Sequence, residues 1–83
     1  MNYTISIEKR AKKFIDAQPK TQQLRILDAV ANLPQGDTKP LSGYTDVFRL
    51  RVGSYRIIFT KQDDVLLIQV VDAGNRGQIY KTW

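Results

Sequence analysis

The spacing of apolar residues gives the first half of the chain two kinds of pattern. Residues 3–7 alternate in the order Tyr-Thr-Ile-Ser-Ile, and this period of two predicts a short strand. Helical spacing follows from Glu8 to Gln18, and it returns from Lys20 to Leu33. Pro19 lies between these two segments, and proline fits the first turn of a helix. The first half therefore predicts one strand followed by a helical hairpin.

The second half of the chain keeps a period of two, which predicts an antiparallel meander of three strands. The expected strands are Val47–Val52, Tyr55–Thr60 and Val65–Val71. Gly53 and Ser54 form a two-residue hairpin loop, with glycine at the position that a type II′ turn requires. Residues 38–45 are predicted to form a loop, and residues 61–64 a four-residue turn.

The order of these elements indicates an α+β fold in which the helices pack on one face of the sheet. A chain of 83 residues has no room for a second hydrophobic core. We therefore expect a single domain over residues 1–83.

The two-residue hairpin loop fixes how the first two strands of the meander pair. Val52 then lies opposite Tyr55, and Arg51 lies opposite Arg56. One face of this hairpin is apolar and carries Phe48, Leu50, Val52, Tyr55, Ile57 and Phe59. We expect the helices to bury that face, because an apolar sheet face must be covered.

The predicted turn at residues 61–64 carries the same pairing onto the third strand of the meander. Arg56 would then lie opposite Gln69, and Ile58 opposite Leu67. Asp72 shares the parity of the apolar face on this strand.

The other face of the hairpin carries Arg49, Arg51 and Arg56. Like charges directly opposite one another destabilise a strand pair by a few tenths to about 1 kcal/mol. No acidic residue on these strands is expected to neutralise them, and guanidinium groups match phosphate oxygens in bidentate geometry. The pattern indicates an anion site, with three solvated surface arginines as the alternative. Beyond the third strand, Arg76 adds a cation and Tyr80 a ring that could stack on a base or transfer a proton.

Charge and composition narrow the possible chemistry. Lys and Arg outnumber Asp and Glu by 13 to 8, which favours a polyanionic partner: nucleic acid, an acidic protein segment or a membrane surface. The chain has no cysteine and no histidine, so disulfides, thiolate metal sites and the usual general base near neutral pH are excluded. We expect no metal and no cofactor. Neither a signal peptide nor a membrane span is evident, so the expected compartment is the cytoplasm and no membrane partner is expected.

Three segments resemble the RelE/ParE toxin superfamily. The segment Val47–Phe59 (VFRLRVGSYRIIF) resembles the family's hairpin, and residues 39–43 (KPLSG) resemble the loop that precedes it. Gly74-Asn75-Arg76, followed by Tyr80, resembles the family's C-terminal motif. The order of elements agrees with that family over nearly the whole chain, which implies a RelE-like fold.

The resemblance implies a toxin of a type II toxin–antitoxin system. RelE-like members enter the ribosomal A site and cleave mRNA, and a cognate antitoxin covers their basic face. The toxin–antitoxin complex can bind operator DNA through the antitoxin. On this basis Arg56, Arg76 and Tyr80 are the expected catalytic residues. Arg49 and Arg51 would bind RNA phosphates, at positions where RelE itself has lysines.

The expected chemistry is metal-independent cleavage of RNA by the ribose 2′-hydroxyl. Arg56 and Arg76 would stabilise the charge of the crowded phosphorane. Tyr80 is the only titratable candidate base among the matched residues, and neighbouring cations favour ionisation of a tyrosine hydroxyl. The ribosome would supply much of the alignment.

Two other functions remain open from the sequence. The hairpin motif is shared with ParE-like toxins, which inhibit DNA gyrase by binding and without catalysis. A non-toxic module that binds RNA or a protein partner could also have kept this fold, because fold alone does not settle function.

Overall fold

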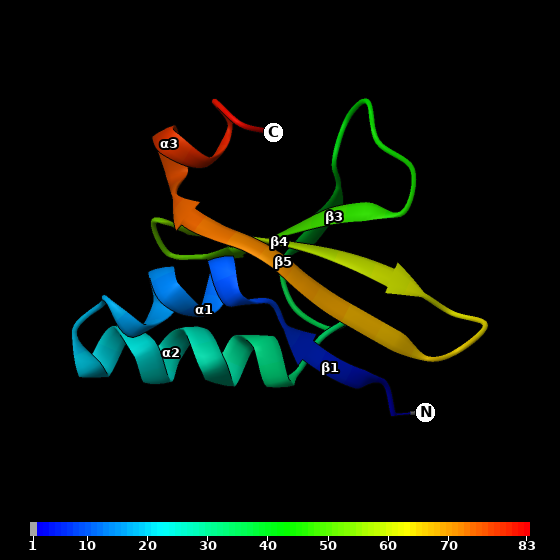
Figure 1. Ribbon diagram of the computed structural model, residues 1–83, viewed down its shortest axis with the longest axis horizontal. Helices are drawn as coiled ribbons and strands as arrows, with labels where there is room; N and C mark the ends of the chain where they lie inside the picture. Colours follow the sequence, from blue (N-terminus) through cyan, green and yellow to red (C-terminus); the bar gives the residue numbers. More distant parts are fainter. Residues whose placement is uncertain (1) are drawn as a thin grey trace.

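A five-stranded sheet with helices on both faces makes up the computed structural model, which describes residues 2–83 (Figure 1). In chain order the elements are β1 (Thr4–Ile7), α1 (Lys9–Asp16), α2 (Lys20–Ala31), β2 (Thr38–Pro40), β3 (Val47–Val52), β4 (Tyr55–Gln62), β5 (Leu67–Asn75) and α3 (Arg76–Ile79). The strands lie in the order β1-β5-β4-β3-β2. β1 is parallel to β5, and the other neighbours are antiparallel. The predicted α+β fold class is confirmed.

The main core lies between the sheet and the pair formed by α1 and α2. Ala11 and Ile15 of α1 and Ile26 of α2 are buried against the apolar face of the β3–β4 hairpin. The register predicted for that hairpin is confirmed from Val52 opposite Tyr55 to Phe48 opposite Phe59. Gly53 has a φ of 59°, which suits glycine at the first central position of the turn.

The sequence missed one strand, because residues 38–40 form β2 at the edge of the sheet and not a loop. β2 pairs with β3, with Thr38 opposite Leu50 and Pro40 opposite Phe48. A three-residue strand that contains proline gives almost no alternating pattern, and proline is tolerated because an edge strand needs no hydrogen bond on its outer side.

The predicted pairing of β4 with β5 is wrong. Arg56 lies opposite Gly74, and Ile58 lies opposite Asp72. β4 extends to Gln62, inside the predicted turn, and β5 begins only at Leu67. The register also shifts by one residue between Ile58 and Phe59. A bulge of this kind flips the side chains beyond it to the other face. Asp72 therefore shares a face with Ile58 and Arg56 and not with the main core.

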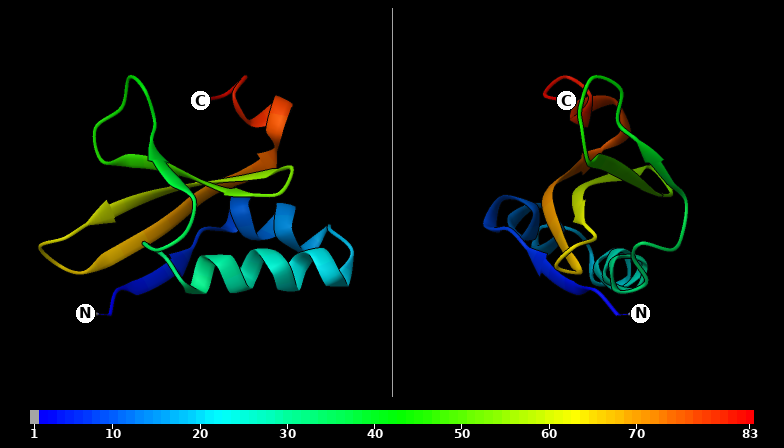
Figure 2. Two further views of the ribbon diagram at one scale, coloured as in Figure 1. Left: turned by 180° about the vertical axis from the view of Figure 1, so that it is seen from behind. Right: turned by 90° about the vertical axis from the view of Figure 1, so that its right-hand side faces the viewer.

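The second face of the sheet has a small core of its own. Leu41, Ile58 and Ile79 are buried together, and Trp83 packs against them. Ile79 belongs to α3, so this short helix covers the face opposite to α1 and α2 (Figure 2). The sequence did not predict α3. Within residues 2–83 the longest helix, α2, has 12 residues, and no helix has the length and apolar character needed to cross a membrane.

Candidate functional site

The candidate site lies around the β3–β4 turn, which is formed by Gly53 and Ser54. Arg56 is 8% exposed, and its Nη1 donates hydrogen bonds to the carbonyl oxygens of Gly53 and Tyr55, both at 2.9 Å. Arg56 forms no ion pair with any carboxylate of residues 2–83. The turn thus fixes a guanidinium group whose charge is not neutralised.

Arg49 and Arg51 share an acidic partner that the sequence did not predict. Arg49 Nη1 lies 3.2 Å from Asp37 Oδ1, and Arg51 Nε lies 2.6 Å from Asp37 Oδ2. The Asp37 carbonyl also accepts hydrogen bonds from Arg49 Nη1 and from the Arg51 backbone N–H, both at 2.9 Å. The expectation of an arginine face without a counter-ion is therefore wrong. Asp37 escaped prediction because it lies in the connection before β2, where no period indicates which side chains will meet.

These contacts hold the pKa of Asp37 below its usual value. The largest cause is the hydrogen bond from Arg49, and the positive charge of Arg51 adds to it. The carboxylate is well exposed, with 43% of its side-chain surface accessible. It therefore offsets one of the two positive charges of Arg49 and Arg51 at neutral pH while remaining open to exchange with a solvent anion.

Acidification is expected to remove the stabilisation that Asp37 supplies. Its pKa is lower in the folded protein than in the unfolded chain, so the contribution is complete above the usual aspartate pKa. It is lost as the pH falls through the lowered value. Urea unfolding should show Asp37→Asn less stable than wild type at neutral pH, with the difference closing in acid. A difference that does not change with pH would contradict this assignment.

Arg76 and Tyr80 lie at the two ends of α3. The backbone N–H of Arg76 donates to the Ser54 carbonyl at 2.8 Å, so α3 begins directly beside the hairpin turn. Tyr80 follows the helix and is 44% exposed. Glycine at position 74 of β5 lets α3 pack closely against this strand, because a Cβ there would lie 3.1 Å from Ile79 Cδ1. The structure thus brings Arg51, Arg56 and Arg76 to one end of the sheet.

A buried carboxylate fastens the segment that follows α3. Asp72 Oδ2 accepts a hydrogen bond from Trp83 Nε1 at 2.8 Å, and Asp72 Oδ1 accepts one from the Ala73 backbone N–H at 2.8 Å. Arg10 of α1 reaches the same carboxylate at 3.2 Å. The Trp83 ring lies 5.5 Å from that of Tyr44. Asp72 thus links α1, on one face of the sheet, to the segment after α3 on the other face. This link depends on the bulge, which places the Asp72 side chain on the second face.

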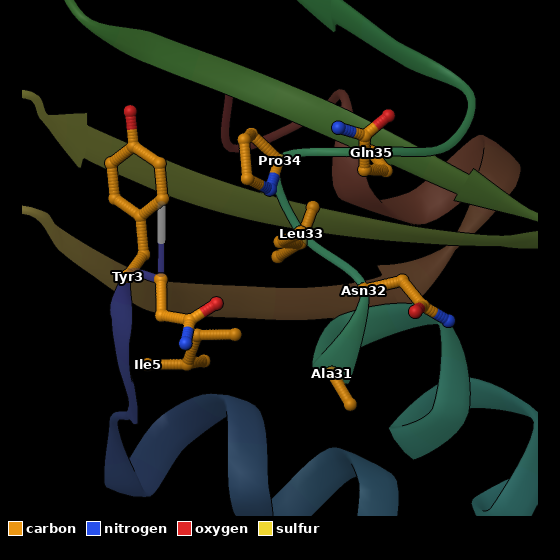
Figure 3. A pocket seen from close by; sticks show the side chains of 8 residues that line it. Tyr3, Ile5, Ala31, Asn32, Leu33, Pro34 and Gln35 are labelled. Atoms are coloured by element: carbon orange, nitrogen blue, oxygen red, sulfur yellow. The ribbon is translucent and has the colours of Figure 1, made fainter.

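Two pockets in the molecule are lined by residues other than the predicted site residues. One, of about 370 Å³, lies between the N-terminal strand and the end of α2, and is lined by Tyr3, Ile5, Ala31 and Leu33–Gln35 among others (Figure 3). A second, of about 320 Å³, lies beside α3 and includes Arg10 and Asp72. Neither includes any of the five predicted site residues. Arg51 and Tyr80 are exposed, which suits a polymer that binds along a surface better than an enclosed small molecule.

Several solved toxin–antitoxin structures share this fold. A chain of the archaeal RelE–RelB complex from Pyrococcus horikoshii OT3 is 28% identical, covers 94% of this chain and 99% of its own length, and has a TM-score of 0.77. The RelBE2 complex from Mycobacterium tuberculosis gives 18% identity, coverage of 92% and 100%, and a TM-score of 0.79. The RelBE complex from E. coli gives 22%, 88% and 95%, and 0.72. The last two likenesses show the fold alone.

The family follows from the sequence match. Residues 5–80 match the model of the ParE toxin of type II toxin–antitoxin systems, parDE. This chain belongs to that family, within the RelE/ParE superfamily, and is a toxin of a type II toxin–antitoxin system. No curated protein is significantly similar to it in sequence.

Proposed function

We propose that this protein is a metal-independent endoribonuclease that cleaves mRNA in the ribosomal A site and so inhibits translation. The observation that carries the proposal is the environment of Arg56. Its guanidinium is fixed by two carbonyl groups, has no carboxylate partner among residues 2–83, and lies beside the turn on which Arg76 begins α3. A fixed, uncompensated cation is suited to charge that develops only in a transition state.

The proposed reaction moves one proton away from the attacking oxygen and delivers one to the leaving oxygen. The ribose 2′-oxygen bonds to the adjacent phosphorus while the bond to the 5′-oxygen breaks, which leaves a 2′,3′-cyclic phosphate and a 5′-hydroxyl. Arg56 and Arg76 stabilise the phosphorane charge, and Tyr80 as the base takes the proton from the 2′-hydroxyl. The leaving 5′-oxygen, its charge held by Arg76, takes a proton from water. The site has few groups for proton transfer, so the ribosome contributes alignment of the reacting atoms.

Arg49 and Arg51 are proposed to bind RNA phosphates by exchange with Asp37. The carboxylate occupies both guanidinium groups in the free protein, and a phosphate has the same bidentate match. RNA affinity then reflects competition between a backbone phosphate and the protein's own Asp37. Arginine keeps its charge at any physiological pH, which suits binding better than proton exchange.

Affinity for RNA should change in opposite directions when either partner of this contact is replaced. Arg51→Ala is expected to weaken binding and to reduce the slope of log affinity against log salt by about 0.7, the value for one phosphate of a single strand. Asp37→Asn is expected to strengthen binding, because it frees both arginines. Fluorescence anisotropy with labelled oligouridine over a salt series measures both effects. If both variants titrate like wild type, these arginines are only solvated surface.

A cognate antitoxin is the proposed protein partner. The solved complexes pair RelE chains with RelB antitoxins, and we propose that an acidic partner covers the basic face of this toxin in the cytoplasm. The complex would bind operator DNA through the antitoxin. Co-purification with the product of an adjacent gene tests the partnership, and failure of that product to bind would count against it.

Primer extension on a translated mRNA after induction of the toxin tests the proposed activity. Cleavage within codons supports it. The match to the ParE toxin family favours a second candidate, an inhibitor of DNA gyrase that acts by binding alone. Intact message together with a DNA-damage response would support that candidate and overturn the first.

A further inference from the structure

One arginine outside the predicted site contacts the hairpin turn from the helical side. Arg25 of α2 lies so close to Gly53 that a Cβ on this glycine would be 3.0 Å from both Nη1 and Nη2 and 3.2 Å from Cζ. The φ of 59° already favours glycine here, and the guanidinium uses the space that a side chain would fill. The absence of a side chain at Gly53 therefore leaves room for the Arg25 guanidinium to contact the turn.

The three distances also indicate how this guanidinium lies. The two terminal nitrogens are nearer to the Cβ position than the central carbon is, so the nitrogen end of the group, and not its aliphatic stem, meets the turn. The N–H donors of arginine lie in the plane of the group. Within residues 2–83 the Arg25 side chain has no hydrogen-bond acceptor, so these donors remain available to an acceptor outside the protein.

Arg25, Arg56 and Arg76 reach this one turn from three different elements. Arg56 of β4 donates to the Gly53 carbonyl, and the backbone of Arg76 donates to the Ser54 carbonyl. None of the three forms an ion pair within residues 2–83. Figure 1 shows the turn at one end of the molecule, with α3 on one side of it and α1 and α2 on the other.

This clustering of arginines around the turn is unfavourable in the free protein and favours the binding of an anion. Arg51 also faces Arg56 across the strand pair, and its partner Asp37 already shares its charge between two arginines. Like charges directly opposite one another on paired strands repel, and a phosphate would relieve that repulsion through charge-assisted hydrogen bonds.

We propose that Arg25 binds a backbone phosphate of the single-stranded RNA, on the helical side of the hairpin turn. This inference rests on the proposed function, and it extends the RNA path beyond the catalytic residues. The strand would pass across Gly53-Ser54 from Arg76 on α3 to Arg25 on α2. The residue acts in binding and takes no part in the reaction.

Replacement of Arg25 by glutamine tests this, because glutamine removes the charge and keeps part of the stem. Lys20→Gln is the matched control: it removes one charge from the same helix, at a position about 140° around the axis from Arg25. Binding of a short labelled oligouridine is measured by anisotropy over a salt series, thermal unfolding of each variant is recorded, and wild type is tested for cleavage of translated mRNA.

The expected result is a several-fold loss of affinity for Arg25→Gln, a salt slope smaller by about 0.7, and an unchanged melting temperature. A titration that matches Lys20→Gln would overturn the inference while Arg51→Ala still reports on the proposed function. A lower melting temperature with an unchanged slope would also overturn it and assign Arg25 to packing. If wild type binds oligouridine through Arg25 but leaves translated mRNA intact, the proposed function fails and the phosphate contact stands.

Discussion

Tyr80→Phe is expected to lower single-turnover cleavage of ribosome-bound mRNA by roughly 10²–10⁴-fold, the usual contribution of a positioned acid or base. Affinity for the ribosome should change little. Phenylalanine keeps the aromatic ring, so stacking on a base survives while the hydroxyl is lost. Tyr80 is 44% exposed and lies directly after α3, where a bound strand can reach it.

The comparison with Tyr80→Ala separates two roles of this side chain. Loss of cleavage in both variants assigns the hydroxyl to proton transfer. Loss in the alanine variant alone assigns the ring to positioning of the RNA. Full cleavage by both would remove Tyr80 from the mechanism, and unchanged toxicity alongside it would favour the gyrase-binding candidate.

The hairpin at the centre of the fold could be predicted because its determinants are local. Two turn residues with glycine first leave one pairing for β3 and β4, and the apolar alternation gives the same pairing. The pairing of β5 with β4 could not be predicted from local sequence. Its turn lies at residues 63–66, two residues later than predicted, and the bulge between Ile58 and Phe59 leaves no mark in the pattern of apolar residues.

The residues of the candidate site also differ in whether the local sequence pattern could predict them. The face shared by Arg49, Arg51 and Arg56 follows from strand parity alone, and the structure places Arg76 beside the same turn. The contacts that complete the site are long-range. Asp37 reaches the arginines from the connection before β2, and no local pattern encodes that approach.

Arg25 illustrates the same limit on a helix. Basic residues on an exposed helix surface are ordinarily solvated, and nothing in the spacing of α2 distinguishes Arg25 from Lys20. The distinction arises only when the hairpin packs against the helix and Gly53 meets the guanidinium. A glycine required for backbone reasons thus also provides the room for a charged side chain.

The second large effect is expected at Asp72, whose replacement by alanine should lower the free energy of unfolding by about 2–4 kcal/mol. The carboxylate is 4% exposed and accepts hydrogen bonds from Trp83 Nε1 and the Ala73 N–H, which would both lose their partner. Arg10 adds little, because its side chain is 61% exposed and water screens the pair. Asp72→Asn should cost less than Asp72→Ala, because its amide oxygen can still accept one of these bonds.

A double-mutant cycle with Trp83→Phe isolates the contact that fastens α3. Phenylalanine keeps an aromatic ring against Ile58 and removes the indole N–H together with the five-membered ring that carries it. If the hydrogen bond holds the segment in place, Asp72→Ala and Trp83→Phe should couple by about 0.5–3 kcal/mol in urea unfolding. Additive effects would contradict this. Because α3 also carries Arg76 and leads into Tyr80, Trp83→Phe should slow mRNA cleavage, at a temperature where the variant remains folded, through loss of alignment and not of a reacting group.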